Sequence, residues 1–137
     1  MIRFKVDGEP QGKGRPRYTA QGRVYTPEKT REYEKHVRWC YSIFCKSKRF
    51  ASDVPLSVEI LACYAPPKSA SKKTKQMMLS GEVRPTKKPD ADNIAKIILD
   101  ALNGVAYDDD KQVIHLDVNK KYAERACVYV EITEAHK

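Results

Sequence analysis

The alternation of apolar and polar residues along the chain predicts four half-buried β-strands. Residues 2–6 alternate apolar and charged side chains, and the same two-residue period recurs over 55–64, 113–118 and 127–132. This period is typical of a strand that buries one face. The polar segment 120–124 lies between the last two runs, so we expect those two strands to form a hairpin.

A long helix is expected after the first strand and a glycine- and proline-rich loop. Thr26-Pro27-Glu28 is a typical helix start, with a hydroxyl at the N-cap and proline at the first helical position. The helix is expected to end near Cys45. Its predicted buried face comprises Tyr33, Val37, Cys40, Tyr41 and Phe44.

Two further helices are expected in the second half of the chain. Residues 71–79 form a candidate short helix that Gly81 ends. A second helix is expected to begin at Asp92 or Asn93 and to stop at Asn103-Gly104. The apolar stripe of this second helix comprises Ile94, Ile97, Ile98, Ala101 and Leu102. The predicted element order is therefore β-α-β-(α)-α-β-β.

The length and composition indicate one cytoplasmic domain. The 137 residues fit a single domain over 1–137. No apolar run is long enough to cross a bilayer, and the charged N-terminal residues do not suit a signal peptide. The four cysteines form no C-x-x-C pair, which argues against structural zinc and favours free buried thiols in a reducing compartment. We therefore expect no membrane partner.

The net charge of +8 conceals two unlike parts. Residues 90–117 contain seven aspartates and two lysines, a net charge of −5, so the rest of the chain carries +13. A plain phosphate-binding surface gains nothing from such a group of carboxylates. A metal-dependent enzyme that acts on a polyanion needs both parts. An ordinary protein with an uneven charge distribution is the alternative.

The acidic segment contains the candidate catalytic residues. If the backbone between Asp90 and Asp92 is extended, its two-residue period places both carboxylates on one side. In the helix that follows, Asp92, Lys96 and Asp100 stack along one face at helical spacing. A strand that returns along this helix can bring Asp110 close to Asp90 and Asp92.

Carboxylates in this arrangement suit Mg²⁺, which is usually held by one or two carboxylates together with substrate phosphate. Bound metal can drive phosphodiester hydrolysis. Each residue also has a structural alternative: Asp92 as a helix N-cap, Lys96 as an ion-pair partner, and residues 108–110 as a polar turn. An EF-hand is excluded, because no window that starts at these aspartates has the glycine and glutamate that such a loop requires.

The same stretch resembles the signature of the RusA family of Holliday junction resolvases. These are small, often prophage-borne endonucleases that cut four-way DNA junctions. The family pattern opens with a basic residue and Pro-Asp-x-Asp-Asn, continues with a lysine and Asp-Ala-Leu, and closes with Asp-Asp-x-Gln-Val. The matching elements here are Lys88-Pro89-Asp90-Ala91-Asp92-Asn93, Lys96, Asp100-Ala101-Leu102 and Asp109-Asp110-Lys111-Gln112-Val113. The basic loop 13–17 also resembles that of many members.

The resemblance implies an α/β (α+β) fold, with a small mixed sheet flanked by helices. It also implies a homodimer that depends on Mg²⁺, for which Mn²⁺ is expected to substitute. The residues that correspond to the family's metal-binding catalytic carboxylates are Asp90, Asp92 and Asp110, and the essential lysine corresponds to Lys96. Supporting positions around them are Asn93, Asp100 and Asp109.

The basic residues gain a role if the substrate is DNA. We expect phosphate contacts from Lys13, Arg15, Arg17, Lys72, Lys73, Lys75, Arg84, Lys87 and Lys88, and binding that weakens steeply with salt. Recognition of a branch point rests on shape and backbone geometry. Tyr18 and Tyr25 have two interpretations, which are stacking on unpaired bases and packing within the protein.

The sequence thus predicts a Mg²⁺-dependent crossover junction endodeoxyribonuclease that resolves Holliday junctions in recombination and repair. It cuts by paired symmetric cleavage, and a two-fold symmetric dimer suits a junction that needs two cuts. One alternative is a nuclease specific for other branched DNA. The other is a non-catalytic DNA-binding protein with structural carboxylates.

Overall fold

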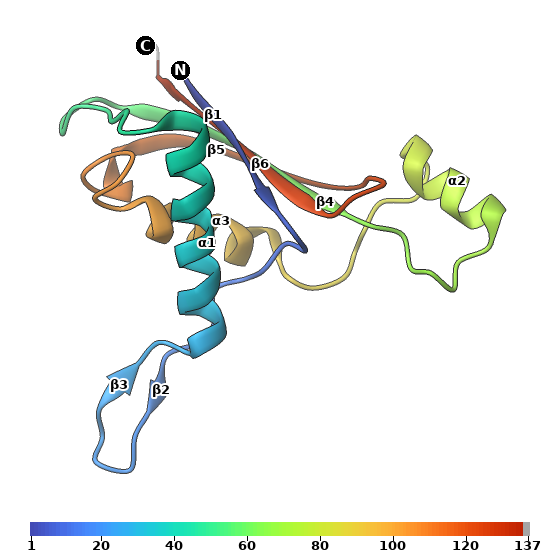
Figure 1. The fold of residues 1–137 in the computed structure, drawn as a ribbon, viewed down its shortest axis with the longest axis horizontal. Helices are drawn as coiled ribbons and strands as arrows, with labels where there is room; N and C mark the ends of the chain where they lie inside the picture. The colour runs from blue at the N-terminus through green and yellow to red at the C-terminus, as the bar shows by residue number, and fades with distance from the viewer. Residues whose placement is uncertain (136–137) are drawn as a thin grey trace.

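A mixed four-stranded sheet with helices on one face forms the body of the molecule (Figure 1). The computed structural model describes residues 1–135. The sheet has the order β1-β6-β4-β5, and its strands are β1 (Ile2–Asp7), β4 (Leu56–Tyr64), β5 (Val113–Tyr122) and β6 (Cys127–Glu134). The helices are α1 (Glu28–Cys45), α2 (Lys72–Ser80), α3 (Ala91–Leu102) and the short 3₁₀ turn η1 (Asp110–Gln112). The predicted mixed α+β fold is confirmed.

The expected hairpin between the last two strands is wrong. β5 pairs in parallel with β4, while β6 lies on the other side of β4 and pairs antiparallel with both β4 and β1. The segment after β5 therefore crosses the end of β4, where the Ala123 N–H donates to the Tyr64 carbonyl at 2.8 Å. Period-two alternation marks a strand's buried face but does not specify its partner. The largely exposed β5 lies at the edge, and the apolar β4 lies inside the sheet.

The core lies between the sheet and two helices. α1 packs on β1, and α3 packs against α1 and β5. The predicted apolar stripe of α3 is fully confirmed: Ile94, Ile97, Ile98, Ala101 and Leu102 are all buried. Because this stripe fixes the rotation of α3 about its axis, it also determines that the polar side chains of α3 face outward.

α1 ends at Cys45 as predicted but differs from the prediction at its start and in its buried face. It begins at Glu28, and Pro27 rather than Thr26 occupies the N-cap position. Phe44 was expected in the buried face but is 56 % exposed, whereas Cys45 is buried. Cys45 continues the buried row of Val37 and Tyr41 at four-residue spacing and therefore faces the sheet. Phe44 lies outside this row and points toward solvent.

Two protrusions extend from the body in different directions (Figure 1). One is a hairpin of β2 (Arg17–Tyr18) and β3 (Val24–Tyr25), which the sequence reasoning missed although Gly22, at φ +82°, marks its turn. The other carries the predicted α2, capped by the Ser71 side chain at its start and ended by a left-handed Gly81. α2 has no buried residue, so its role is not to fill the core.

Two expectations from composition can be checked within residues 1–135. Cys40, Cys45, Cys63 and Cys127 are buried and unpaired, as expected for free structural thiols. None of the helices in this part of the chain has the length and apolar character needed to span a membrane.

Candidate active site along the polar face of α3

Asp90 and Asp92 lie at the N-terminal end of α3. Asp90 is the N-cap residue with an extended backbone, and the Ile94 N–H donates to its carbonyl at 3.0 Å. Asp92 already lies in the first helical turn. The expected extended stretch up to Asp92 is therefore wrong, because aspartate is a favoured N-cap and Ala91 a strong helix former. Among residues 1–135, neither carboxylate has a hydrogen bond or ion pair within the protein.

The N-terminal basic loop packs directly against this end of α3. The Lys13 N–H donates to the Asn93 carbonyl at 3.2 Å. A Cβ atom on Gly12 would lie 2.9 Å from Pro89 Cβ and 3.1 Å from Asn93 Cβ, so the glycine permits a close backbone approach. The loop thus supports the segment that carries both aspartates.

Replacing Gly12 by alanine is expected to separate the loop from α3. The added methyl group clashes with Pro89 and Asn93, which should lower the free energy of unfolding by about 1–3 kcal/mol and reduce any activity that depends on Asp90 and Asp92. Urea denaturation measures the first effect. The neighbouring Gln11 is exposed, so Gln11→Ala is the control; equal stability of the two variants would contradict this packing.

Lys13, predicted to contact phosphate, is engaged within the protein. Its ammonium group lies 2.7 Å from Glu34 Oε2 and 3.2 Å from Asp100 Oδ2, and its side chain is 20 % exposed. Burial lowers the pKa of Lys13, but the hydrogen bonds to Glu34 and Asp100 outweigh burial and raise it. Lys13 therefore joins the loop to α1 and α3, and a contact with DNA stays a prediction.

Lys96 lies on the same face of α3, one turn before Asp100. Its Nζ is 3.5 Å from Asp100 Oδ2, and its side chain is 60 % exposed. This ion pair is the structural alternative considered for Lys96, but its length and exposure make it weak. Asp100 keeps Lys13 as a closer partner, so Lys96 is free to exchange Asp100 for another anion.

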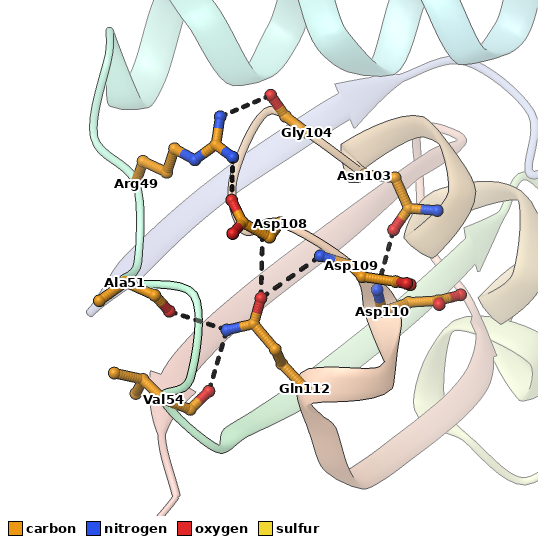
Figure 2. Close-up of polar contacts among 9 residues, drawn as sticks. All are labelled: Arg49, Ala51, Val54, Asn103, Gly104, Asp108, Asp109, Asp110 and Gln112. Atoms are coloured by element: carbon orange, nitrogen blue, oxygen red, sulfur yellow. Dashed lines mark hydrogen bonds and ion pairs between the residues drawn. The ribbon is translucent and has the colours of Figure 1, made fainter.

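The turn after α3 is organised by Gln112, which is buried (Figure 2). Its Oε1 accepts hydrogen bonds from the N–H groups of Asp108 and Asp109, and its Nε2 donates to the carbonyls of Ala51 and Val54 at 2.9 and 3.1 Å. The carboxamide therefore connects the acidic turn to the segment before β4. Sequence reasoning quoted Gln112 only as part of a motif and did not assign it this role.

Removing the Gln112 carboxamide should loosen the acidic turn. Gln112→Ala leaves two carbonyls and two N–H groups without partners, and we expect a loss of about 2–4 kcal/mol in the free energy of unfolding. Chemical denaturation measures this loss. Lys111→Ala, one residue earlier and exposed, is the matched control. The assignment fails if Gln112→Ala is no less stable than that control.

Asp108 is held away from the other two acids of the turn. Its carboxylate pairs with the Arg49 guanidinium, which also donates to the Gly104 carbonyl at 2.8 Å (Figure 2). The hydrogen bond from Arg49 keeps the pKa of Asp108 below its usual value. Asp108 thus stabilises the turn, and it has no counterpart in the family motif.

Asp109 and Asp110 form a carboxyl pair that points away from Gln112 (Figure 2). The Asp110 N–H donates to Asn103 Oδ1 at 2.9 Å, while Asp109 caps η1. Burial raises the pKa of Asp110 most. The hydrogen bond and charge of Asp109 and the charge of Asp100 raise this pKa further, whereas the positive charge of Lys96 lowers it. The hydrogen bond with Asp110 lowers the pKa of Asp109. Asp110 therefore lies close to other negative charges that disfavour its ionised form, and a bound cation would favour that form.

Within residues 1–135, Asp90, Asp92 and Asp110 do not form a closed cage around a metal position. Asp90 and Asp92 lie at the start of α3, whereas Asp110 is influenced by Asp100 and Lys96 in its second half. Within residues 1–135, no three acids, histidines or cysteines lie close enough together to form a ready-made metal site. The available donors are carboxylate oxygens, which suit Mg²⁺, an ion that commonly needs only one or two of them besides phosphate and water.

The comparison with known families decides the family to which the chain belongs. The family described as Endodeoxyribonuclease RusA matches residues 7–133, which include every element that builds the acidic face. The chain belongs to the RusA family. It is also 38 % identical over 136 residues to the Bacillus subtilis (strain 168) protein described as uncharacterized protein YqaN, a match that covers 97 % of this chain and 96 % of that one.

RusA membership implies endodeoxyribonuclease activity on branched DNA junctions. The basic residues predicted for this substrate fall into two groups on this RusA protein. Arg15 and Arg17 are exposed in the hairpin region, where Tyr18 and Tyr25 are 70 % and 46 % exposed rather than packed in the core. Lys72, Lys73 and Lys75 belong to α2. In Figure 1 the α3 helix lies between these two protrusions.

Three other predicted DNA contacts of this RusA protein lie on the segment that returns from α2. Arg84 donates to the Lys120 carbonyl through Nε and Nη2 at 3.0 and 2.7 Å, and the Lys87 ammonium lies 5.1 Å from the centre of the Tyr64 ring. Lys88 is exposed. Arg84 and Lys87 thus have structural partners that sequence reasoning did not foresee.

Proposed function

We propose that this protein is a cytoplasmic, Mg²⁺-dependent endonuclease that resolves Holliday junctions by paired symmetric cuts in recombination and repair. One observation carries the proposal. Asp90 and Asp92 lie at the N-terminal end of α3 in a strongly basic RusA protein, and neither carboxylate has a partner among the described residues. Unpartnered carboxylates of this kind are suited to bind a cation.

Asp90, Asp92 and Asp110 would hold the metal ion. When bound, Mg²⁺ supplies charge neutralisation at the phosphate and favours deprotonation of an attacking water. The raised pKa of Asp110, caused by burial and by its acidic neighbours, supports its assignment, because a cation would lower the cost of ionising it. Asn103 Oδ1 accepts a hydrogen bond from the Asp110 N–H and so fixes the backbone at this position.

Lys96 is the candidate that contacts the reacting phosphate. It lies one helical turn beyond Asp92, and among residues 1–135 its exposed ammonium group has a single weak partner, Asp100. A lysine in this position stabilises the negative charge that develops on the phosphate oxygens. Asn93 and Asp100 flank it, and Asp100 is fixed by Lys13, so we assign these two residues a supporting role.

The two protrusions are suited to hold DNA across the acidic face. Arg15 and Arg17 on one side and Lys72, Lys73 and Lys75 on the other would neutralise backbone phosphates. The exposed Tyr18 and Tyr25 of the hairpin would stack on unpaired bases. A homodimer would supply two such sites related by a two-fold axis, which matches the symmetry of a four-way junction.

Cleavage of a panel of labelled substrates tests this proposal against a nuclease for other branched DNA. The wild-type protein with Mg²⁺ should place symmetric paired nicks in a four-way junction and leave linear duplex intact. Preferred cutting of flaps would favour the alternative nuclease. Equal cutting of linear duplex would refute junction resolution.

A further inference from the structure

A long strap links the end of β4 to the proposed metal-binding residues. It leaves the sheet after Tyr64, carries α2, and returns to the body immediately before Asp90. In Figure 1 the strap runs far from the sheet over much of its length. A segment with so few anchors needs a fixed point close to Asp90 if that carboxylate is to have a defined position.

Lys120 on β5 provides such a fixed point. Its Nζ donates to the Lys87 carbonyl at 2.6 Å and to the Pro89 carbonyl at 3.0 Å. An ammonium group carries three donors, and two of them thus bind the backbone of the last turn of the strap. Within residues 1–135 this ammonium group forms no ion pair with a carboxylate, so these carbonyls are its polar partners.

A residue of the strap also binds the backbone of Lys120. Arg84 donates two hydrogen bonds to the Lys120 carbonyl. The Tyr64 ring lies near both ammonium groups, with its centre 5.6 Å from Lys120 Nζ and 5.1 Å from Lys87 Nζ, which favours the cationic side chains. The anchor therefore joins β4, β5 and the strap.

We propose that Lys120 is a positioning residue for the cation site, because it fixes the strap at Lys87 and Pro89 and so sets the position of Asp90. Asp90 follows Pro89 directly, and its own carbonyl accepts the first hydrogen bond of α3. Its backbone is thus held on one side by β5 and on the other by the helix. This inference rests on the proposed function, since it assigns Lys120 a role toward the metal that Asp90 would bind.

The neighbouring lysine provides a matched control. Lys120 is in register with buried Ala62 on the helix-covered face, whereas Lys121 is in register with Cys63 on the opposite face. Lys121 is exposed, and within the part of the chain that the structure describes it forms no hydrogen bond or ion pair through its side chain. Lys120→Met and Lys121→Met therefore remove the same charge from adjacent residues with different contacts.

Two measurements other than cleavage test the inference. Titration of Mn²⁺ into the DNA-free protein should show binding weakened roughly 10–100-fold in Lys120→Met, the range found when residues that orient metal ligands are removed, and unchanged in Lys121→Met. Hydrogen exchange should speed up at residues 87–93 in Lys120→Met alone. Lys120→Gln, which shortens the side chain, is measured in parallel so that the comparison does not depend on the folding of one variant.

The outcomes separate the inference from the proposed function. If the wild-type protein binds Mn²⁺ and cuts junctions but the Lys120 variants match Lys121→Met in both measurements, the positioning role is overturned and the proposed function stands. If the wild-type protein neither binds Mn²⁺ nor cuts junctions, the proposed function fails and the inference fails with it. Weakened Mn²⁺ binding with faster exchange supports both.

Discussion

Replacing Asp90 and Asp92 together by asparagine is expected to abolish junction cleavage while leaving junction binding intact or tighter. Loss of both carboxylates removes the cation from the start of α3, and with it several kcal/mol of transition-state stabilisation, or roughly a 10³-fold fall in rate. Binding should not suffer, because two carboxylates near phosphate repel it when no metal is present.

The double variant is best compared with Asp117→Asn. Asp117 belongs to the same acidic segment but lies on β5 at the uncovered face of the sheet, beside Asn119, so its loss changes the charge without touching the site. Gel-shift titration and cleavage kinetics on one labelled four-way junction measure both properties. Unaltered cleavage by the double variant would make the carboxylates structural and would favour the non-catalytic alternative.

Lys96→Met is expected to lower the cleavage rate by roughly 10²–10³-fold, the usual cost of removing one group that stabilises charge in a transition state. Stability should hardly change. A helical ion pair of this kind contributes only about 0.2–0.5 kcal/mol, and Asp100 retains Lys13 as its partner. Single-turnover cleavage together with thermal unfolding separates these two effects.

Lys111→Met is the control for Lys96, because Lys111 is exposed and lies in the same acidic segment. Both substitutions remove one positive charge, so a general weakening of DNA binding should appear equally in the two variants. A specific role for Lys96 requires a fall in rate at saturating junction that Lys111→Met does not show. A structural role alone would instead appear as a lower melting temperature with an unchanged rate.

Local patterns in the sequence were sufficient where one surface determines the structure. The stripe from Ile94 to Leu102 predicted which side of α3 is buried, and consequently that Lys96 and Asp100 share the outer side. Gly81 correctly predicted the end of α2. In each case the residues that fix the structure are close together in sequence and follow one period.

Features that depend on distant partners could not be predicted in this way. The pairing of β5 with β4 instead of β6 involves strands separated by α2 and α3. From the sequence, Lys13 and Arg84 could be assigned only as positive charges available to DNA. Their partners, Glu34 and the Lys120 carbonyl, are distant in the chain. Gly12 illustrates the same limit, because its closeness to Pro89 is a tertiary contact between residues far apart in the chain.

A crystal soaked in Mn²⁺ and measured for anomalous scattering tests the central claim most directly. The claim is that Asp90 and Asp92 at the start of α3 and Asp110 after its end serve one divalent cation. We predict an anomalous peak coordinated by oxygens of these three aspartates, and none in the crystal of the Asp90→Asn, Asp92→Asn variant. A wild-type crystal with no peak at these residues, or with one only elsewhere, would contradict the claim.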